Sequence, residues 1–136
     1  MAKRNEIEEL TNHWKRALAD YQNLEKRYAR EKADFVAYAG SNLILKLMTV
    51  LDHLEKVKSY LKDEGLEIAL REFKRVLEEE GLREIEAAGK DFDPLLMEAV
   101  EAVRSDKVGK VVEEVTKGYQ LKDKVIRVAK VKVGRK

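Results

Sequence analysis

The sequence predicts an α+β protein in which a long coiled-coil helix leads into a helical bundle, followed by a small C-terminal all-β domain. Three observations predict this fold class. Of the 136 residues, 40% are charged and only 7% are aromatic, which is typical of long helices rather than of a thick globular core. Apolar residues repeat in steps of three and four through the first sixty residues. Near the C-terminus, strict alternation of apolar and polar residues replaces this rhythm.

Residues 1–40 are predicted to form the coiled-coil part of the long helix. Charged residues surround one apolar row, and only Glu31 interrupts it. About fifty helical residues extend roughly 75 Å, whereas a compact monomer of this length has a radius of gyration near ~14 Å. The chain therefore cannot cover the row by itself. A parallel homodimer is the simplest way to bury it, and an antiparallel dimer or a foreign partner remains open. The row consists of Ile7, Leu10, Trp14, Ala17, Tyr21, Leu24, Tyr28, Phe35 and Tyr38.

Residues 41–81 are predicted to form the bundle region. The rhythm restarts after Gly40, one position out of register, and a second apolar row accompanies it. A stripe of this width indicates a helix inside a bundle. We expect one helix to continue through Gly40, and two helices separated at Gly40-Ser41 are the alternative, because glycine weakens a helix. The continued dimer row is Leu43, Leu47, Val50 and Leu54, and the second row is Ile44, Met48 and Leu51.

A shorter helix is predicted over residues 63–80, after a short connector. Asp63 is a suitable N-cap, and Gly81 is a suitable C-terminal stop. Two chains, each giving this helix and the end of the long one, would form a four-helix bundle across the dimer.

Residues 82–136 are predicted to form the β domain. The run Ala129–Val133 alternates strictly, and the run from Val111 to Leu121 is rich in β-branched residues. Lys122-Asp123-Lys124 is interpreted as a hairpin turn between these two runs. The segment from Leu95 to Val103 fits either a helix or a strand.

Charge is unevenly distributed along the chain. Residues 117–136 hold eight basic side chains and one acidic one, whereas residues 1–116 hold 20 basic and 25 acidic ones. No uninterrupted apolar run approaches the roughly 18 residues of a membrane span, and the N-terminus has no signal-peptide pattern. We therefore expect a cytoplasmic protein that does not contact a membrane.

The sequence offers little for catalysis, and we expect no enzyme, metal site or cofactor. There is no cysteine, and the seven glycines are scattered singly, without a phosphate-binding loop. His13 and His53 lie on the long helix, where we interpret them as solvated side chains.

The basic C-terminal end suggests either a phosphate-binding strip or a protected sheet edge. Lys130 and Lys132 alternate with valines and would share one strand face. Lysine also prevents edge strands from aggregating, and no aromatic residues for base stacking accompany these lysines. We favour the edge interpretation and do not expect nucleic-acid binding.

Five segments in order resemble the GrpE family, the nucleotide exchange factors of the DnaK chaperone. They cover roughly residues 14 to 134. Met97 stands where the family usually has histidine, and Val128 where it usually has proline. The segments are Arg16–Asn23, Val50–Glu55, Glu64–Ile68, Phe92–Val100 and Thr116–Leu121 with Val125–Val131.

The resemblance implies a homodimeric co-chaperone of protein folding and the stress response. Its β domain would press on the ATPase domain of a DnaK-type chaperone and promote ADP release, without a catalytic residue. The alternatives are a coiled-coil holdase that cradles unfolded proteins and a basic nucleic-acid-binding dimer. The ordered motifs are explained by neither alternative.

The resemblance also implies chaperone-contact residues where the motifs match. Gly118 and Tyr119 are expected to be structural, and Arg127 to hold the β domain together. For Val115 and Val133, a place in the core is the competing interpretation, and for Gly65 it is a helix start. The expected contact residues are Gly65, Leu95, Ala99, Val115, Lys117, Lys124 and Val133.

The long helix is expected to melt before the bundle on heating. Trp14 and Tyr21 are bulky for a two-stranded core, and Glu31 interrupts the row. Members of the family are thought to slow exchange in this way, and we expect the same here.

Overall fold

The computed structural model describes residues 1–136. Contacts within the chain divide it into two compact units, Met1–Ala39 and Gly40–Lys136. The first unit is the helix α1 (Ala2–Tyr38), which contains no buried residue. The second unit contains all the buried hydrophobic side chains of the chain, from Met48 to Val131.

The stretch that was predicted as one long helix is interrupted by a single turn at Ala39 and Gly40. Helix α2 (Ser41–Tyr60) follows this turn, and the Ile44 N–H donates to the Gly40 carbonyl at 3.0 Å. The bounds of α1 and α2 agree with the alternative interpretation, two helices separated at Gly40-Ser41. The turn falls where the apolar rhythm changes register.

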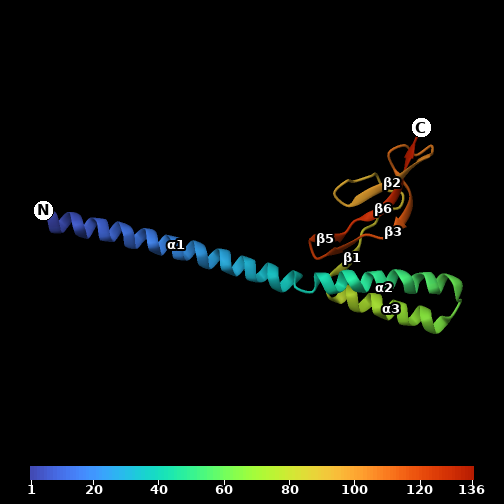
Figure 1. The fold of residues 1–136 in the computed structure, drawn as a ribbon, viewed down its shortest axis with the longest axis horizontal. Helices are drawn as coiled ribbons and strands as arrows, with labels where there is room; N and C mark the ends of the chain where they lie inside the picture. The colour runs from blue at the N-terminus through green and yellow to red at the C-terminus, as the bar shows by residue number, and fades with distance from the viewer. The chain divides into compact units, whose positions relative to one another are not determined.

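Helix α3 (Glu64–Glu79) confirms the predicted short helix and both of its ends. Its N-cap is Asp63, whose carboxylate accepts from the Leu66 N–H at 3.2 Å. Gly81 follows its end with φ +95°, a left-handed conformation that glycine adopts without strain. A three-residue connector separates it from α2, and the two helices lie side by side (Figure 1).

Six strands form two three-stranded sheets. The inner sheet has the order β1-β4-β5 and is antiparallel, and it consists of β1 (Leu82–Glu84), β4 (Tyr119–Leu121) and β5 (Lys124–Arg127). The outer sheet has the order β2-β6-β3, in which β6 is parallel to β2 and antiparallel to β3. It consists of β2 (Met97–Arg104), β3 (Val111–Thr116) and β6 (Ala129–Arg135).

Two predictions about these strands are corrected. The turn at Lys122-Asp123 joins β4 to β5, so the alternating run Ala129–Val133 is not the hairpin partner of Tyr119–Leu121. That run forms β6, which is the central strand of the outer sheet and not an edge strand. The segment Leu95–Val103, which was left open between helix and strand, forms most of β2.

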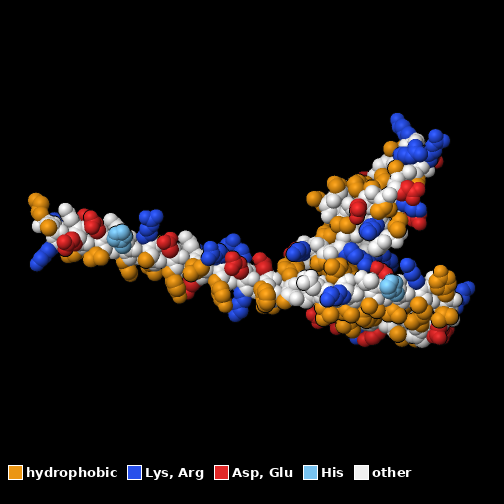
Figure 2. Space-filling view, viewed as in Figure 1, with side chains coloured by type: hydrophobic (Ala, Val, Ile, Leu, Met, Phe, Trp, Pro, Cys, Tyr) orange, Lys and Arg blue, Asp and Glu red, His pale blue; other side chains and the backbone are white.

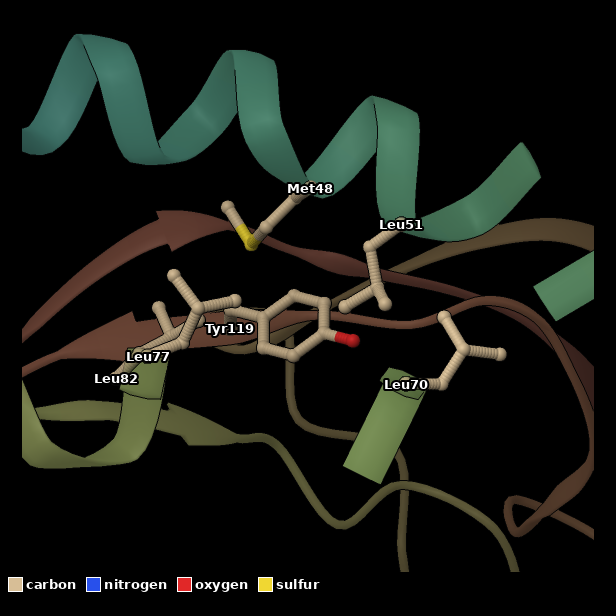
Figure 3. Packing of buried hydrophobic residues seen from close by; sticks show 6 residues of the cluster. All are labelled: Met48, Leu51, Leu70, Leu77, Leu82 and Tyr119. Carbon is tan, nitrogen blue, oxygen red and sulfur yellow. The ribbon is translucent and has the colours of Figure 1, made fainter. Parts of the chain in front are cut away.

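Each sheet has its own hydrophobic cluster. The inner cluster combines α2, α3 and the inner sheet, and Figure 3 shows the Tyr119 ring lying among its aliphatic side chains; its buried members are Met48, Leu51, Leu70, Leu77, Leu82 and Tyr119. The outer cluster is Ala87, Met97, Val111, Ala129 and Val131. The inner sheet therefore packs on the helices, and the outer sheet carries a separate core.

One helical stretch, Ala2–Tyr60, is long and apolar enough to cross a membrane by length and composition alone. No uninterrupted apolar run in this stretch approaches 18 residues, and the stretch passes because an averaged window tolerates polar residues. The same test is passed by core helices of soluble proteins, and Met48 and Leu51 of this stretch are buried in the inner cluster.

Candidate functional site

The apolar row of α1 is uncovered within its own chain. Ile7 and Trp14 are each 63% exposed, and Phe35 is 74% exposed. Only Tyr38, at the end of the row, is half-buried. Figure 2 shows the hydrophobic side chains gathered along one side of this helix. The row is thus available for another chain, as the sequence predicts.

Helices α2 and α3 bury one apolar row and expose another. Met48 and Leu51 of the second row are buried in the inner cluster, with Ile44 packed against it. In the predicted dimer row, Leu43 and Val50 are at least half exposed, whereas Leu47 and Leu54 are half-buried. Exposed apolar residues continue onto α3 and include Ile68 and Val76. Figure 2 shows hydrophobic side chains on the side of α2 and α3 that is turned away from the sheets.

The outer sheet brings three of the expected chaperone contacts together. Ala99 lies on β2, Val115 on β3 and Val133 on β6. Ala99 and Val115 are exposed, so the core interpretation does not hold for Val115. Val133 is half-buried against the outer cluster. Leu95 lies in the turn before β2 and is 80% exposed.

The other three expected contacts lie elsewhere. Lys117 connects β3 to β4, and its ammonium lies 3.6 Å from the Glu84 carboxylate. Lys124 is exposed at the start of β5. Gly65 is the second residue of α3 and is roughly 20 Å along that helix from β1, at 1.5 Å per residue. A Cβ at Gly65 would lie 3.0 Å from the Asp63 carboxylate, so this glycine is also part of the helix cap.

Arg127 joins the inner sheet to α2. Its two terminal nitrogens donate to both carboxylate oxygens of Asp52, at 2.7 and 3.2 Å. Its Nε donates to the Lys117 carbonyl at 2.9 Å, and the guanidinium lies 5.2 Å from the centre of the Tyr119 ring. Arg127 was expected to hold the β domain together, and the structure shows it fastening that domain to a helix.

Tyr119 is the buried centre of this contact. Burial, with the nearby carboxylates of Glu84 and Asp52, raises the pKa of its phenol to about 12, and Arg127 opposes the shift. Each of these influences except that of Arg127 disfavours a phenolate. The ring is packed as expected, and the phenol is neutral at ordinary pH.

A second ion pair, Glu55–Lys74, links α2 to α3 beside Tyr119. Burial by itself would raise the pKa of the Glu55 carboxyl. The hydrogen bond and charge of Lys74, with the charges of Lys117 and Lys58, outweigh burial and lower that pKa overall. Glu55 is therefore ionised at neutral pH and holds Lys74 in place.

Two glycines allow close backbone contacts between segments. A Cβ at Gly118 would lie 2.4 Å from the Ala129 nitrogen, which confirms the expected tight point. A Cβ at Gly134 would lie 2.1 Å from the Lys107 carbonyl oxygen. Met97, one of the two departures from the GrpE pattern, is buried in the outer cluster, and Val128 is half-buried between β5 and β6.

The basic strip on β6 is partly neutralised by its neighbours. Lys132 lies 3.5 Å from Glu101 on β2 and 3.2 Å from Glu113 on β3. The lysine thus pairs with both flanking strands of a central strand, which replaces the edge interpretation. His13 and His53 are exposed, and no group of three His, Asp or Glu side chains is placed to hold a metal ion.

Sequence reasoning missed the acidic partners of the helix–sheet contact. Asp52 and Glu55 follow Met48 at spacings of four and seven residues, so they share the face that α2 buries. An acidic residue on the apolar face of a helix indicates a buried basic partner, and this pattern was present in the sequence. Its basic partner Arg127 lies 75 positions further on, and no local pattern connects the two.

Comparison with known proteins gives one consistent family. The GrpE family model matches residues 1–135. A Protein GrpE of Caldanaerobacter subterraneus subsp. tengcongensis is 38% identical over 140 residues, covering 98% of this chain and 69% of the relative. A Protein GrpE of Methanothermobacter thermautotrophicus is 38% identical over 132 residues, covering 94% and 76%. That of Chlamydia abortus is 36% identical over 141 residues, covering 96% and 74%. The chain therefore belongs to the GrpE family.

Proposed function

We propose that this protein is a homodimeric nucleotide exchange factor that binds the ATPase domain of a DnaK-type chaperone and promotes ADP release. The observation that carries the proposal is membership of the GrpE family over residues 1–135. The protein would act in the cytoplasm as a co-chaperone of protein folding and heat stress, not as an enzyme.

The proposed dimer rests on the apolar rows that the chain leaves uncovered. One runs along α1, and the other lies on α2 and α3, opposite the inner sheet. Burying apolar surface contributes about 25 cal/mol per Å², so a second copy that covers both rows would be stabilised along two segments. The exposed row of α2 and α3 fits a four-helix bundle, because each chain supplies two adjacent helices.

The proposed chaperone contact lies on the outer sheet. Leu95, Ala99 and Val115 are exposed apolar residues around one sheet, and Lys117 follows the end of β3. Lys124 lies on the inner sheet and would add positive charge in a separate place. A partner surface with apolar patches and some acidic groups would fit this sheet. Gly65 lies too far along α3 to share that patch and would belong to a separate contact or act only as a cap residue.

The proposed mechanism is a shift of population in the chaperone. A dimer that binds the open nucleotide cleft better than the closed one weakens ADP binding by linkage. Coupling of about 1–3 kcal/mol corresponds to a ~5- to 150-fold weaker nucleotide affinity. No group on this chain needs to react with the nucleotide.

The decisive experiment measures release of a fluorescent ADP from a cognate DnaK-type chaperone, with and without this protein. We expect faster release that saturates with protein concentration. Analytical ultracentrifugation of the protein alone should give a dimer. Unchanged ADP release would contradict the exchange function. A protein that prevents aggregation of unfolded clients without any chaperone would instead be a holdase, which the uncovered row of α1 would also suit.

A further inference from the structure

Three ion pairs surround Tyr119 where the inner sheet rests on the helices, and we call this contact the polar seam. Each pair connects different elements: Asp52–Arg127 joins α2 to β5, Glu55–Lys74 joins α2 to α3, and Glu84–Lys117 joins β1 to the β3–β4 connection. The candidate partner contacts lie outside these pairs, apart from Lys117. The proposed function therefore gives the Asp52–Arg127 and Glu55–Lys74 pairs no direct part in binding.

Arg127 has more partners than any other side chain of the seam. It bonds both oxygens of Asp52 and the Lys117 carbonyl, and it lies over the Tyr119 ring. A planar guanidinium in a two-oxygen contact permits only a narrow range of relative orientations. The side chains of Arg127 and Asp52 are only 17% and 30% exposed, so water competes weakly for these bonds.

The same residue lies directly beside the outer sheet. Arg127 ends β5, and β6 begins at Ala129, so only Val128 separates the two sheets along the chain. Gly118 lies tightly against Ala129, and the Ala129 N–H donates to the Leu96 carbonyl at 3.0 Å. Arg127 is thus connected to the outer sheet by one intervening residue and by a close backbone contact. Fixing the orientation of Arg127 relative to α2 therefore also restricts the orientation of the sheet that carries Ala99, Val115 and Val133.

A partly buried ion pair contributes little net stability compared with an apolar contact of the same shape, because desolvation offsets the attraction. It does discriminate between orientations, since bonds to both carboxylate oxygens fail when the groups rotate. The polar seam is thus better suited to fixing an angle than to increasing affinity.

We propose that the Asp52–Arg127 pair is a positioning clamp that fixes the outer sheet relative to α2, so that binding of the partner is converted into opening of its nucleotide cleft. This inference rests on the proposed function. A molecule with a loosened clamp would still bind the partner, because its contact residues remain. It would distinguish the open from the closed cleft of the partner less well, because a loosened outer sheet could change its orientation and bind the closed cleft too.

The first test measures ADP release as a function of protein concentration for Asp52→Ala and Arg127→Lys. We expect the maximal release rate to fall by about fivefold or more, the lower end of usual coupling between sites. The half-saturating concentration should change less than about twofold. Lys90→Ala is the control, because it removes an exposed basic residue that pairs with the Glu86 carboxylate outside the seam and outside the proposed dimer and chaperone contacts. It should leave both quantities unchanged.

The second test measures the clamp directly. The chain has no cysteine, so single cysteines introduced at the exposed positions His53 on α2 and Lys130 on β6 can be spin-labelled without background. The distance distribution between the labels should be narrow in the otherwise unchanged protein and in Lys90→Ala. It should broaden in Asp52→Ala and in Arg127→Lys.

The outcomes distinguish failure of the clamp from failure of the proposed function. An unchanged maximal rate in either folded clamp variant, or an unchanged distance distribution, would overturn the clamp. A rise in half-saturation at a constant maximal rate would also overturn it, because the pair would then serve binding. If Asp52→Ala does not fold, Arg127→Lys tests the clamp, because lysine keeps the positive charge and loses only the two-oxygen hydrogen bonding of the guanidinium. Failure of the unmodified protein to accelerate release would instead refute the proposed function, and the clamp with it.

Discussion

At the scale of single residues, Gly118 occupies a position where another segment leaves no room for a side chain. A Cβ there would meet the Ala129 nitrogen at 2.4 Å, and backbone atoms cannot give way as a flexible side chain can. We expect Gly118→Ala to lower the free energy of unfolding by about 1–3 kcal/mol or more. Denaturation by urea, followed by circular dichroism, measures this change.

The control for that measurement is Gly40→Ala. A Cβ at Gly40 would meet nothing within 4 Å, and its φ of −87° suits any residue. Alanine there should change stability by less than about 1 kcal/mol, and in the stabilising direction. Equal effects of the two substitutions would show that the close approach at Gly118 is not a packing constraint.

The raised pKa of Tyr119 predicts that the stability of the protein depends on pH. An unfolded tyrosine loses its proton near pH 10, whereas the folded Tyr119 keeps it to about pH 12. The unfolded state therefore binds fewer protons in this interval, so stability is fully present below pH 10 and falls as the pH rises toward 12. Urea denaturation between pH 9 and 12 should show this fall. Tyr119→Phe, which cannot ionise, should show a shallower fall, and parallel pH profiles would contradict the raised pKa.

At the scale of elements, the start of α3 depends on a single cap. The Asp63 carboxylate accepts from the Leu66 N–H, and Gly65 leaves space for it. Asp63→Ala should lower the free energy of unfolding by about 1 kcal/mol, whereas Asp63→Ser should lose only a few tenths. Thermal or urea unfolding checks both. Equal losses for Ala and Ser would mean that the cap hydrogen bond contributes nothing.

The cap also determines how substitutions at Gly65 should be interpreted. A Cβ there would lie 3.0 Å from the Asp63 carboxylate oxygen, so a side chain at this position presses on the cap as well as on any partner. If Gly65 contacts the chaperone, a bulky substitution should weaken exchange far more than Asp63→Ala does. Equal losses of exchange in the two variants would assign Gly65 to the helix start alone.

At the scale of the whole molecule, the two units should unfold separately on heating. Helix α1 has no buried residue, whereas Gly40–Lys136 holds both hydrophobic clusters. We expect circular dichroism to show a lower transition for α1 and a higher one for the remainder. The lower transition should rise with protein concentration, because association stabilises it.

A matched variant separates the two transitions. Glu31 interrupts the apolar row, and Glu31→Leu should raise the lower transition while leaving the higher one in place. A single transition that is common to α1 and the β strands would contradict independent unfolding. So would an equal shift of both transitions in the variant.

Features that depend on neighbouring residues could be predicted from the sequence. Apolar spacing located the helices, the register change coincided with the turn at Ala39 and Gly40, and Asp63 and Gly81 marked the ends of α3. Five ordered segments were enough to indicate the family. These signals are local, because helix periodicity, caps and left-handed turns involve residues a few positions apart.

The pairing of the strands and the partners of the charged side chains could not be predicted without the folded structure. The alternating run 129–133 looks the same from its sequence whether it lies at an edge or, as here, between β2 and β3. Lys132 faces two carboxylates from other strands, and Arg127 finds Asp52 75 positions away. Such contacts depend on the folding of distant segments onto one another, and the spacing of residues along one chain does not encode them.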